Sequence, residues 1–299
     1  MSLSKSVLDP LEYYAHAGLM TDPKEYGLMF DGLPQEIPEL CKTVQGVLVH
    51  VFWAERQGLK LSEERKQEVN VRPVAEKLHL IKALDDRPLT MAHALEKRLV
   101  GNCRDFSVML CAMLRFQGVP ARARCGFGTY FQPGHFEDHW VCEYWKAGEH
   151  RWVMVDAQLD AFQREALQIR FDPCDLPKGA FLPGGRAWQL CRDGKADPER
   201  FGIFDMHGLW FVLGDFVRDL AALNNVELLP WDSWGFMEKG VDALSAEDMA
   251  FLDHLATLSL ADNGMFDEIR SLYERSAGLR VPKSIKSYTV QGIRTVEIG

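Results

Sequence analysis

The sequence predicts an α+β fold, with helical segments before and after a run of strands. Apolar residues recur at helical spacing in the first third of the chain, and the same spacing returns over residues 103–117. Between residues 121 and 156 the pattern changes to alternation and to runs rich in aromatic and β-branched residues, which is typical of strands. The order of these patterns indicates a helical N-terminal part, a mixed core and a C-terminal extension.

The N-terminal part is expected to be mainly helical. Turn signals in TDPKE and DGLPQE predict irregular structure over about the first 35 residues. The apolar positions between residues 36 and 57 recur at helical spacing and predict one helix. Ser62 opens a second, exposed helical segment, and a third helix is expected after Pro73, because proline is favoured in the first helical turn.

The core segment combines one helix with three strands. Residues 103–117 carry one apolar stripe, and Gly118 with the proline that follows predicts the end of that helix. ARARCGF alternates as a strand does, and the runs HWVCEYW and RWVMVD predict two more strands after the loop TYFQPGHFED. The link between these two runs contains a glycine, so we expect a hairpin with Ala147-Gly148 as its two-residue turn.

The remainder of the chain gives weaker signals. PGGR at residues 183–186 is interpreted as a loop, and it lacks the Lys-Ser/Thr pair of a phosphate-binding loop. The apolar run that ends near Asn225 is expected to be helical in its second half, and Ser245 is a good N-cap for another helix. The last residues predict a hairpin around Gln291-Gly292.

The domain organisation is expected to be simple. No linker is long or polar enough to force a boundary, so residues 1–299 are predicted to form a single domain. Within it we expect a mainly helical part at 1–98, a core at 99–160 and a C-terminal elaboration at 161–299.

The composition predicts a soluble protein, with 47% hydrophobic and 26% charged residues. A net charge of −9 argues against a nucleic-acid backbone or an anionic membrane surface as the main partner. The N-terminus lacks the apolar segment of a secretory signal, and no run approaches the about 20 apolar residues that span a bilayer. We therefore expect a cytoplasmic protein whose 7 cysteines, with no CxxC pair among them, stay reduced.

The stretch GNCRDFS has the features of a nucleophile site. Asn102 is expected to cap the helix by accepting the N–H of Asp105 with its side-chain oxygen. Cys103 then lies in the first helical turn, where the helix dipole and free N–H groups favour the thiolate, the nucleophilic form. The same N–H groups can hold an oxyanion. The ordinary alternative is an inert buried thiol.

The predicted hairpin brings a base and its carboxylate together. With a two-residue turn at Ala147-Gly148, His139 lies directly opposite Asp156, and the two Cβ atoms are about 5 Å apart. A carboxylate at that position selects the tautomer of the imidazole and orients its ring. The pairing depends on the loop, since a change of one residue in its length turns one side chain to the other face.

The three blocks together resemble the transglutaminase-like superfamily of papain-like thiol enzymes. GNCRDFSVMLCAMLRFQGVPARARCGFG is similar to that family's nucleophile helix and following strand, and DHWVCEYW and RWVMVDAQLD are similar to its His and Asp strands. The resemblance covers residues 99–160 and implies a papain-like core, in which the nucleophile helix packs on an antiparallel sheet. It also implies Cys103 as nucleophile, His139 as general base and acid, and Asp156 as the orienting carboxylate. One departure is VDAQLD, where many relatives have proline after the aspartate.

The resemblance also implies a reaction class. It implies acyl transfer through a thioester on a peptide, protein or small amide substrate, either as hydrolysis or as transfer to an amine, without a metal or organic cofactor. The family's side-chain oxyanion donor stays open among Gln45, His50 and Trp53. The alternative is a catalytically silent domain of the same fold that binds a peptide or protein partner.

Other residues near these blocks have two interpretations each. Arg104 either begins a solvated helix or meets a substrate carboxylate or carbonyl, and Trp140 either lies in the core or lines an acyl-binding groove. A metal site could be built from three residues, His135, His139 and Cys142, together with Cys103 or Cys125. Two residues four apart on a strand lie about 13 Å from one another, so we expect no metal there.

Overall fold

The computed structural model describes residues 9–261 and 263–298. Its main sheet has the strand order β6-β3-β4-β7-β8, with β5 paired to β4, and its neighbours are antiparallel except for the parallel pair β4 and β7. These strands are β3 (Ala121–Gly128), β4 (Phe136–Lys146), β5 (Arg151–Val155), β6 (Phe181–Pro183), β7 (Phe201–Ile203) and β8 (Met206–His207).

Two smaller sheets flank the main one. The first is a parallel pair, β1 (Leu48–His50) and β2 (Leu99–Gly101). The second has the order β11-β10-β9, with bounds β9 (Asp232–Ser233), β10 (Ser284–Thr289) and β11 (Gly292–Glu297).

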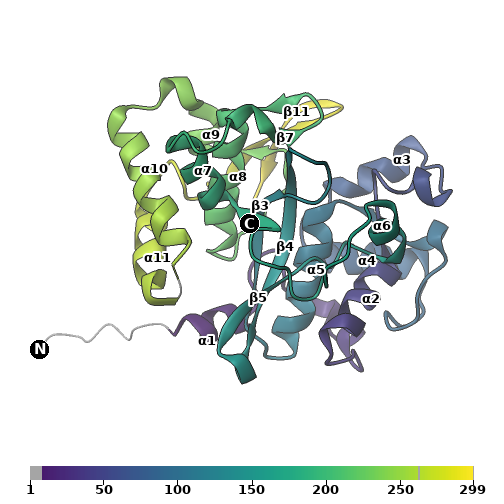
Figure 1. Cartoon of the computed structure of the whole chain (residues 1–299). Coiled ribbons are helices and arrows are strands. Elements are labelled where there is room, and N and C mark those ends of the chain that lie inside the picture. The colour runs from purple at the N-terminus through teal and green to yellow at the C-terminus, as the bar shows by residue number, and fades with distance from the viewer. Residues whose placement is uncertain (1–8, 262, 299) are drawn as a thin grey trace, which may run out of the picture.

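The helices lie on both sides of the central strands (Figure 1). On one side are α2 (Ile37–Val47), α3 (Glu63–Lys66), α4 (Val74–Leu84), α5 (Cys103–Phe116) and α6 (Ala161–Ala166). On the other are α7 (Gly184–Arg192), α8 (Leu209–Ala222), α9 (Gly235–Lys239), α10 (Ala246–Ser259) and α11 (Phe266–Arg275), while α1 (Pro10–Ala15) lies near the start of β5. Short 3-10 turns occur at Lys24–Phe30, Glu55–Gln57, Gln67–Asn70, Leu95–Lys97, Ala147–Glu149, Pro198–Arg200, Val241–Ala243 and Asn263–Met265.

The predicted α+β class is confirmed, and α5 forms the centre of the core. Its apolar stripe packs against β3 and β4, and Met109, Leu110 and Met113 are fully buried there. The stripe recurs every three to four residues, so one face of the helix is apolar, and Gly118 follows its end in the left-handed conformation. In the part of the chain that is described, no helix combines the length and the apolar character that crossing a membrane requires.

Buried ion pairs attach the C-terminal helices to the sheet. Arg124 on β3 donates from Nε and Nη2 to the two carboxylate oxygens of Asp219 on α8, both at 2.8 Å. Arg72 forms a similar two-point contact with Asp232, at 2.9 and 2.6 Å. These bidentate pairs are specific in geometry, and they fix α8 against β3 and Asp232 against Arg72.

Two N-terminal expectations need correction. The helix predicted over residues 36–57 ends at Val47, because the following residues form strand β1 and pair with β2. The first 35 residues, expected to be irregular, contain α1 and a 3-10 turn; residues 1–8 of that expectation lie outside the described part.

In the C-terminal part, the expected helices after Gly208 and Ser245 are confirmed as α8 and α10, and Ser245 caps α10. PGGR is not a loop, because its glycines begin α7. A Cβ at Gly184 would lie 2.6 Å from the Phe216 Cα, so glycine there permits close helix packing. The terminal hairpin is confirmed, with Thr289 opposite Gly292.

A buried charge cluster stabilises the start of α5. The Oδ1 atom of Asp105 lies 2.9 Å from Lys77 Nζ and 3.0 Å from Arg104 Nη1, and all three side chains have 0% exposure. Its Oδ2 atom accepts the Asn102 N–H at 3.0 Å. Burial lowers the pKa of Lys77 to about 8, while Asp105 acts in the opposite direction. One carboxylate thus compensates two buried cations immediately beside Cys103.

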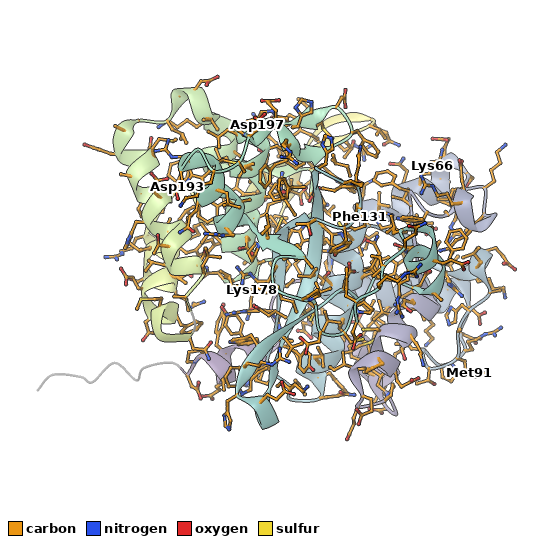
Figure 2. The ribbon with its side chains drawn as sticks, viewed as in Figure 1. Lys66, Met91, Phe131, Lys178, Asp193 and Asp197 are labelled. Atoms are coloured by element: carbon orange, nitrogen blue, oxygen red, sulfur yellow. The ribbon has the colours of Figure 1, made fainter. Side chains whose placement is uncertain are left out.

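We expect Asp105→Asn to lower the free energy of unfolding by about 3–5 kcal/mol, because it leaves two buried cations without their carboxylate. Glu63→Gln is the control, since Glu63 and Lys66 form an exposed pair that contributes at most about 1 kcal/mol; Lys66 lies at the surface in Figure 2. Urea unfolding at neutral pH measures both. A loss below about 1 kcal/mol for Asp105→Asn would contradict the proposed role of the cluster.

Candidate active site

Three different elements carry the candidate triad. Cys103 is the first residue of α5, directly after strand β2 and Asn102. His139 lies in the middle of β4, and Asp156 follows the last residue of β5. All three side chains are buried, with exposures of 8%, 2% and 1% in chain order.

The imidazole of His139 and the carboxylate of Asp156 form a hydrogen bond, with 2.8 Å between Nε2 and Oδ2. An ionised carboxylate only accepts hydrogen bonds, so Nε2 carries the proton. The Nδ1 atom is then the acceptor in a neutral ring. The side of the ring that is not bound to Asp156 is therefore available to take a proton.

The predicted register of this hairpin is wrong by two residues. The loop has four residues, 147–150, rather than a two-residue turn, and Lys146 pairs with Arg151. Asp156 therefore lies in register with Val141 and diagonal to His139. Residues two apart on a strand share a face, so the contact forms in spite of the error.

Tyr130 is a further member of this network. Its hydroxyl donates to the same Oδ2 of Asp156 at 2.6 Å, and burial raises the pKa of Tyr130, which keeps the phenol protonated. The N–H of Gln158 donates to Oδ1 at 3.0 Å, and the Asp156 N–H donates to Pro173 O at 2.8 Å. The sequence predicts only a loop for TYFQPGHFED. The adjacent aromatic residues Tyr130 and Phe131 were the available signal that this loop packs on the site.

The ring of Phe131 covers the imidazole of His139. Their centroids are 4.8 Å apart with an interplanar angle of 67°, and Figure 2 labels Phe131 near the centre of the molecule. Gly128 permits this approach, because a Cβ there would lie 2.6 Å from the Phe131 ring. The aromatic cover reduces solvent access to the imidazole, which strengthens its hydrogen bond to Asp156.

The thiol of Cys103 has a different electrostatic environment from the expected one. Burial raises its pKa well above the ordinary value, and the charge of Asp138 adds to this effect. The N–H groups of Arg104 and Trp140 favour the thiolate and oppose the rise. No hydrogen bond joins the thiol to His139 within the described residues, so the site favours a protonated thiol.

The capping of α5 also differs from the prediction. The side-chain amide of Asn102 is buried without a hydrogen-bond partner among the described residues, and the Asp105 N–H donates to its backbone oxygen at 2.9 Å. The carboxylate of Asp105 instead accepts the Asn102 N–H. Asn102 and Asp105 nevertheless occupy the N-cap and N3 positions of a capping box, as predicted, and the charge cluster holds the Asp105 carboxylate in place.

Of the three upstream oxyanion candidates, His50 has the most suitable position. The side chain of Gln45 donates to Ala157 O at 3.0 Å, and Trp53 packs against Arg56 and Phe162. His50 lies on β1, beside Gly101 of β2, and its ring centroid is 6.3 Å from that of Phe106 on α5.

The protonation state of His50 follows from its contacts. Burial lowers the pKa of His50 to about 3, and the nearby His139 acts in the same direction, so the ring is neutral at physiological pH. Its Nδ1 atom accepts the Phe52 N–H at 3.2 Å, which leaves the proton on Nε2. Nε2 of His50 is thus a neutral hydrogen-bond donor beside the start of α5.

Neither residue named as a substrate contact is accessible. Arg104 has 0% exposure, and its guanidinium donates to Glu227 O, to Arg72 O and to Asp105. Trp140 also has 0% exposure and packs in the main core. Arg104 therefore does not begin a solvated helix, because carbonyl groups distant in the chain hold its guanidinium in the interior.

In the described residues, His135, His139 and Cys142 do not form the metal-binding group considered from the sequence. In the described part of the chain, the group with suitable spacing is Cys125, Asp138 and Asp215, whose ligating atoms lie within 4.8 Å of one another. Cys142 instead contacts Cys111, with 3.3 Å between the sulfur atoms. The group at Cys125 has donors that can hold a divalent cation, but Arg218 already binds Asp215 at 3.2 Å.

Residues 64–157 match the family model described as the transglutaminase-like superfamily, which confirms the resemblance over this part of the chain. The matched range is less than half of the chain and contains Cys103, His139 and Asp156. It indicates a family of papain-like, thiol-dependent acyl-transfer proteins. Searches of curated proteins and of solved structures found no match.

We expect His50 to destabilise the fold in acid. A histidine whose pKa falls from 6.5 to about 3 on folding contributes stability that is fully present above pH 6.5 and is lost as the pH falls toward 3. Between pH 7 and 4.5 the wild type should lose about 2–3 kcal/mol more than His50→Phe. Urea unfolding at both pH values measures the difference, with exposed His16→Asn as the control. Equal losses in wild type and His50→Phe would refute the buried neutral ring.

Proposed function

We propose that the protein catalyses thiol-dependent acyl transfer with Cys103 as nucleophile, His139 as general base and acid, and Asp156 as the orienting carboxylate. The observation that carries the proposal is the 2.8 Å hydrogen bond between His139 Nε2 on β4 and Asp156 Oδ2 just after β5. The helix that begins at Cys103 packs on the same sheet. A base oriented by a carboxylate near a thiol at a helix N-terminus is the arrangement that nucleophilic catalysis requires.

The first half of the reaction forms a thioester. Nδ1 of His139 takes the proton of the Cys103 thiol while the sulfur attacks the carbonyl carbon of an amide or ester. The N–H of Cys103 and Nε2–H of His50 donate to the oxyanion that develops. The imidazolium then returns its proton to the leaving amine or alcohol, the carbonyl bond to that group breaks, and acyl-Cys103 remains.

The second half resolves the thioester. His139 removes a proton from water or from an amine, which attacks the acyl carbon, and the thiol leaves with that proton. Water gives a hydrolase or peptidase, and an amine gives a transferase that exchanges or cross-links amides. Both outcomes use the same residues of this chain.

The raised pKa of Cys103 favours one version of this mechanism. A thiol that stays protonated needs a base at the moment of attack, so proton transfer to His139 accompanies formation of the carbon–sulfur bond. Tyr130, Phe131 and Asp156 hold the imidazole in one orientation for this transfer. The oriented base therefore contributes more to reactivity than a preformed thiolate.

A trapping experiment tests the proposal. The protein is incubated with a panel of peptide amides and activated esters, quenched in acid and mapped by mass spectrometry. We expect an acyl group on Cys103, its absence in Cys103→Ala, and its loss with amide donors in His139→Ala, because an amine leaving group needs the proton of the imidazolium. Adding a primary amine then distinguishes transfer from hydrolysis by the product formed.

The opposite result has a defined meaning. If no donor acylates Cys103 while Cys103 remains reduced and the protein remains folded, the catalytic proposal fails. The catalytically silent domain that binds a peptide or protein partner then becomes the better interpretation.

A further inference from the structure

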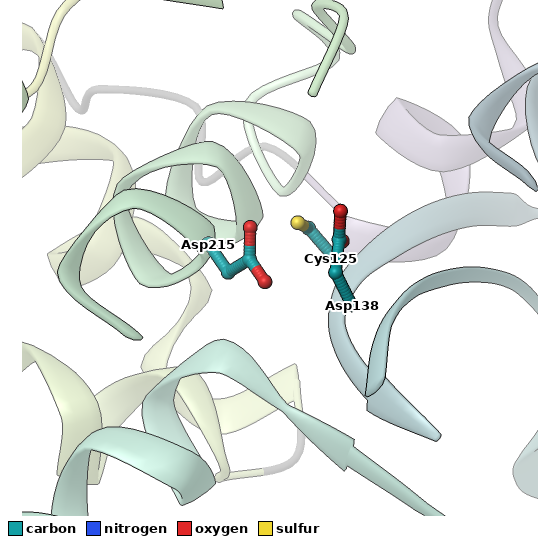
Figure 3. Close-up of side chains that lie close together, drawn as sticks. All are labelled: Cys125, Asp138 and Asp215. Atoms are coloured by element: carbon teal, nitrogen blue, oxygen red, sulfur yellow. The ribbon is translucent and has the colours of Figure 1, made fainter. Parts of the chain in front are cut away.

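A second cluster of ionisable groups lies beside the candidate triad. Cys125 comes from β3, Asp138 from β4 and Asp215 from α8, and each has an atom within 4.8 Å of the other two. Their exposures are 0%, 8% and 1%. Figure 3 shows the carboxylate of Asp215 and the sulfur of Cys125 directed toward each other, with Asp138 beside Cys125.

Two oxygens of this cluster have no partner among the described residues. They are Oδ1 of Asp138 and Oδ2 of Asp215, both buried. Two ionised carboxylates cannot satisfy one another, because each offers only acceptors. One proton between them converts one carboxyl into a donor and satisfies both oxygens. A buried polar atom without a partner costs about 1–3 kcal/mol, so the proton has a clear energetic role.

The surrounding charges support one proton rather than a cation. Arg218 lies 3.2 Å from Asp215 Oδ1 and compensates one negative charge. With the Cys125 thiol protonated, one shared proton brings the two carboxyls and Arg218 to a net charge of zero. The other ionisable groups that act on the cluster are Glu137 and His139 on β4 and Asp219 on α8, and the charge of Asp138 in turn acts on Cys103 of α5.

The titration behaviour agrees with this geometry. Burial raises the pKa of both Asp138 and Asp215 above the usual range of a carboxyl group. Burial also raises the pKa of Cys125, which keeps its thiol protonated. Carboxyl groups this close titrate as a pair, and the second proton to leave is held strongly.

We propose that Asp138 and Asp215 share one proton, and that this pair sets the charge beside the Cys103 thiol. Asp138 is adjacent in sequence to His139, and its charge raises the pKa of the Cys103 thiol and so disfavours the thiolate. Asp215 limits that charge by holding the shared proton near Asp138. The two residues are positioning residues that act through Cys103 and His139, and their effect on catalysis rests on the proposed function.

Two isosteric substitutions give opposite predictions. Asp138→Asn removes the negative charge nearest the thiol, so the pKa of Cys103 falls. Asp215→Asn removes the partner that shares the proton, so Asp138 carries a full charge and the pKa of Cys103 rises. General damage to the fold would not move the two variants in opposite directions.

The rate of alkylation of Cys103 by iodoacetamide, followed by peptide mass spectrometry from pH 6 to 10, measures these shifts without any substrate. Below the thiol pKa we expect Asp138→Asn to react at least about threefold faster than wild type and Asp215→Asn to react more slowly, since one pKa unit is tenfold in thiolate. Asp193→Asn, an exposed position labelled in Figure 2, should match wild type.

Shifts in the same direction, or no shift in either variant, overturn the proposal. The proposal is also overturned if the purified wild type contains a stoichiometric divalent metal ion and Cys125→Ser does not. A cation would then occupy the place of the proton. As a second measurement, the infrared C=O band of a protonated carboxyl should be present in the wild type at neutral pH and weaker in both variants. If the two variants shift the pKa of Cys103 in opposite directions but no acyl adduct forms on Cys103, the shared proton is supported and only the proposed enzymatic function fails.

Discussion

The hydrogen bond from His139 Nε2 to Asp156 Oδ2 is the interaction on which the site depends. It joins the middle of β4 to the residue that follows β5, one position beyond the last pair of that ladder, Cys142 and Val155. Asp156 is itself held by Tyr130, Gln158 and the carbonyl of Pro173. These contacts hold the Asp156 carboxylate in one position. That position determines which imidazole nitrogen of His139 binds the carboxylate and which nitrogen can take a proton.

The site combines groups with opposite effects on the thiol. Burial and Asp138 disfavour a charge on Cys103, while the N–H groups at the start of α5 favour it. The buried cluster of Lys77, Arg104 and Asp105 holds that helix end in place without contacting a substrate. In the proposed mechanism Cys103 is therefore held as a buried thiol, and its reactivity depends on a base whose orientation the sheet determines.

Local patterns in the sequence were sufficient for much of this architecture. The stripe of α5 and the alternation of β3 depend on periodicity, and both elements are where periodicity placed them. The predictions that were wrong share one physical cause, which is contact between segments that are distant in the sequence. Strand β1 exists because it pairs with residues about 50 positions later, α7 begins at glycines that pack on α8, and Arg104 is buried by carbonyls of Glu227 and Arg72. Asp215 could not be placed beside Asp138 from sequence for the same reason.

The tautomer of His139 tests the central claim most directly. In Cys103→Ala at alkaline pH, nitrogen-15 NMR of histidine-labelled protein reports which ring nitrogen carries the proton, and His139→Ala assigns the signal. We predict the proton on Nε2, in a strong hydrogen bond, with Nδ1 unprotonated, because Asp156 accepts from Nε2. A proton on Nδ1 would mean that Asp156 does not orient the imidazole and that His139 cannot accept the thiol proton as described.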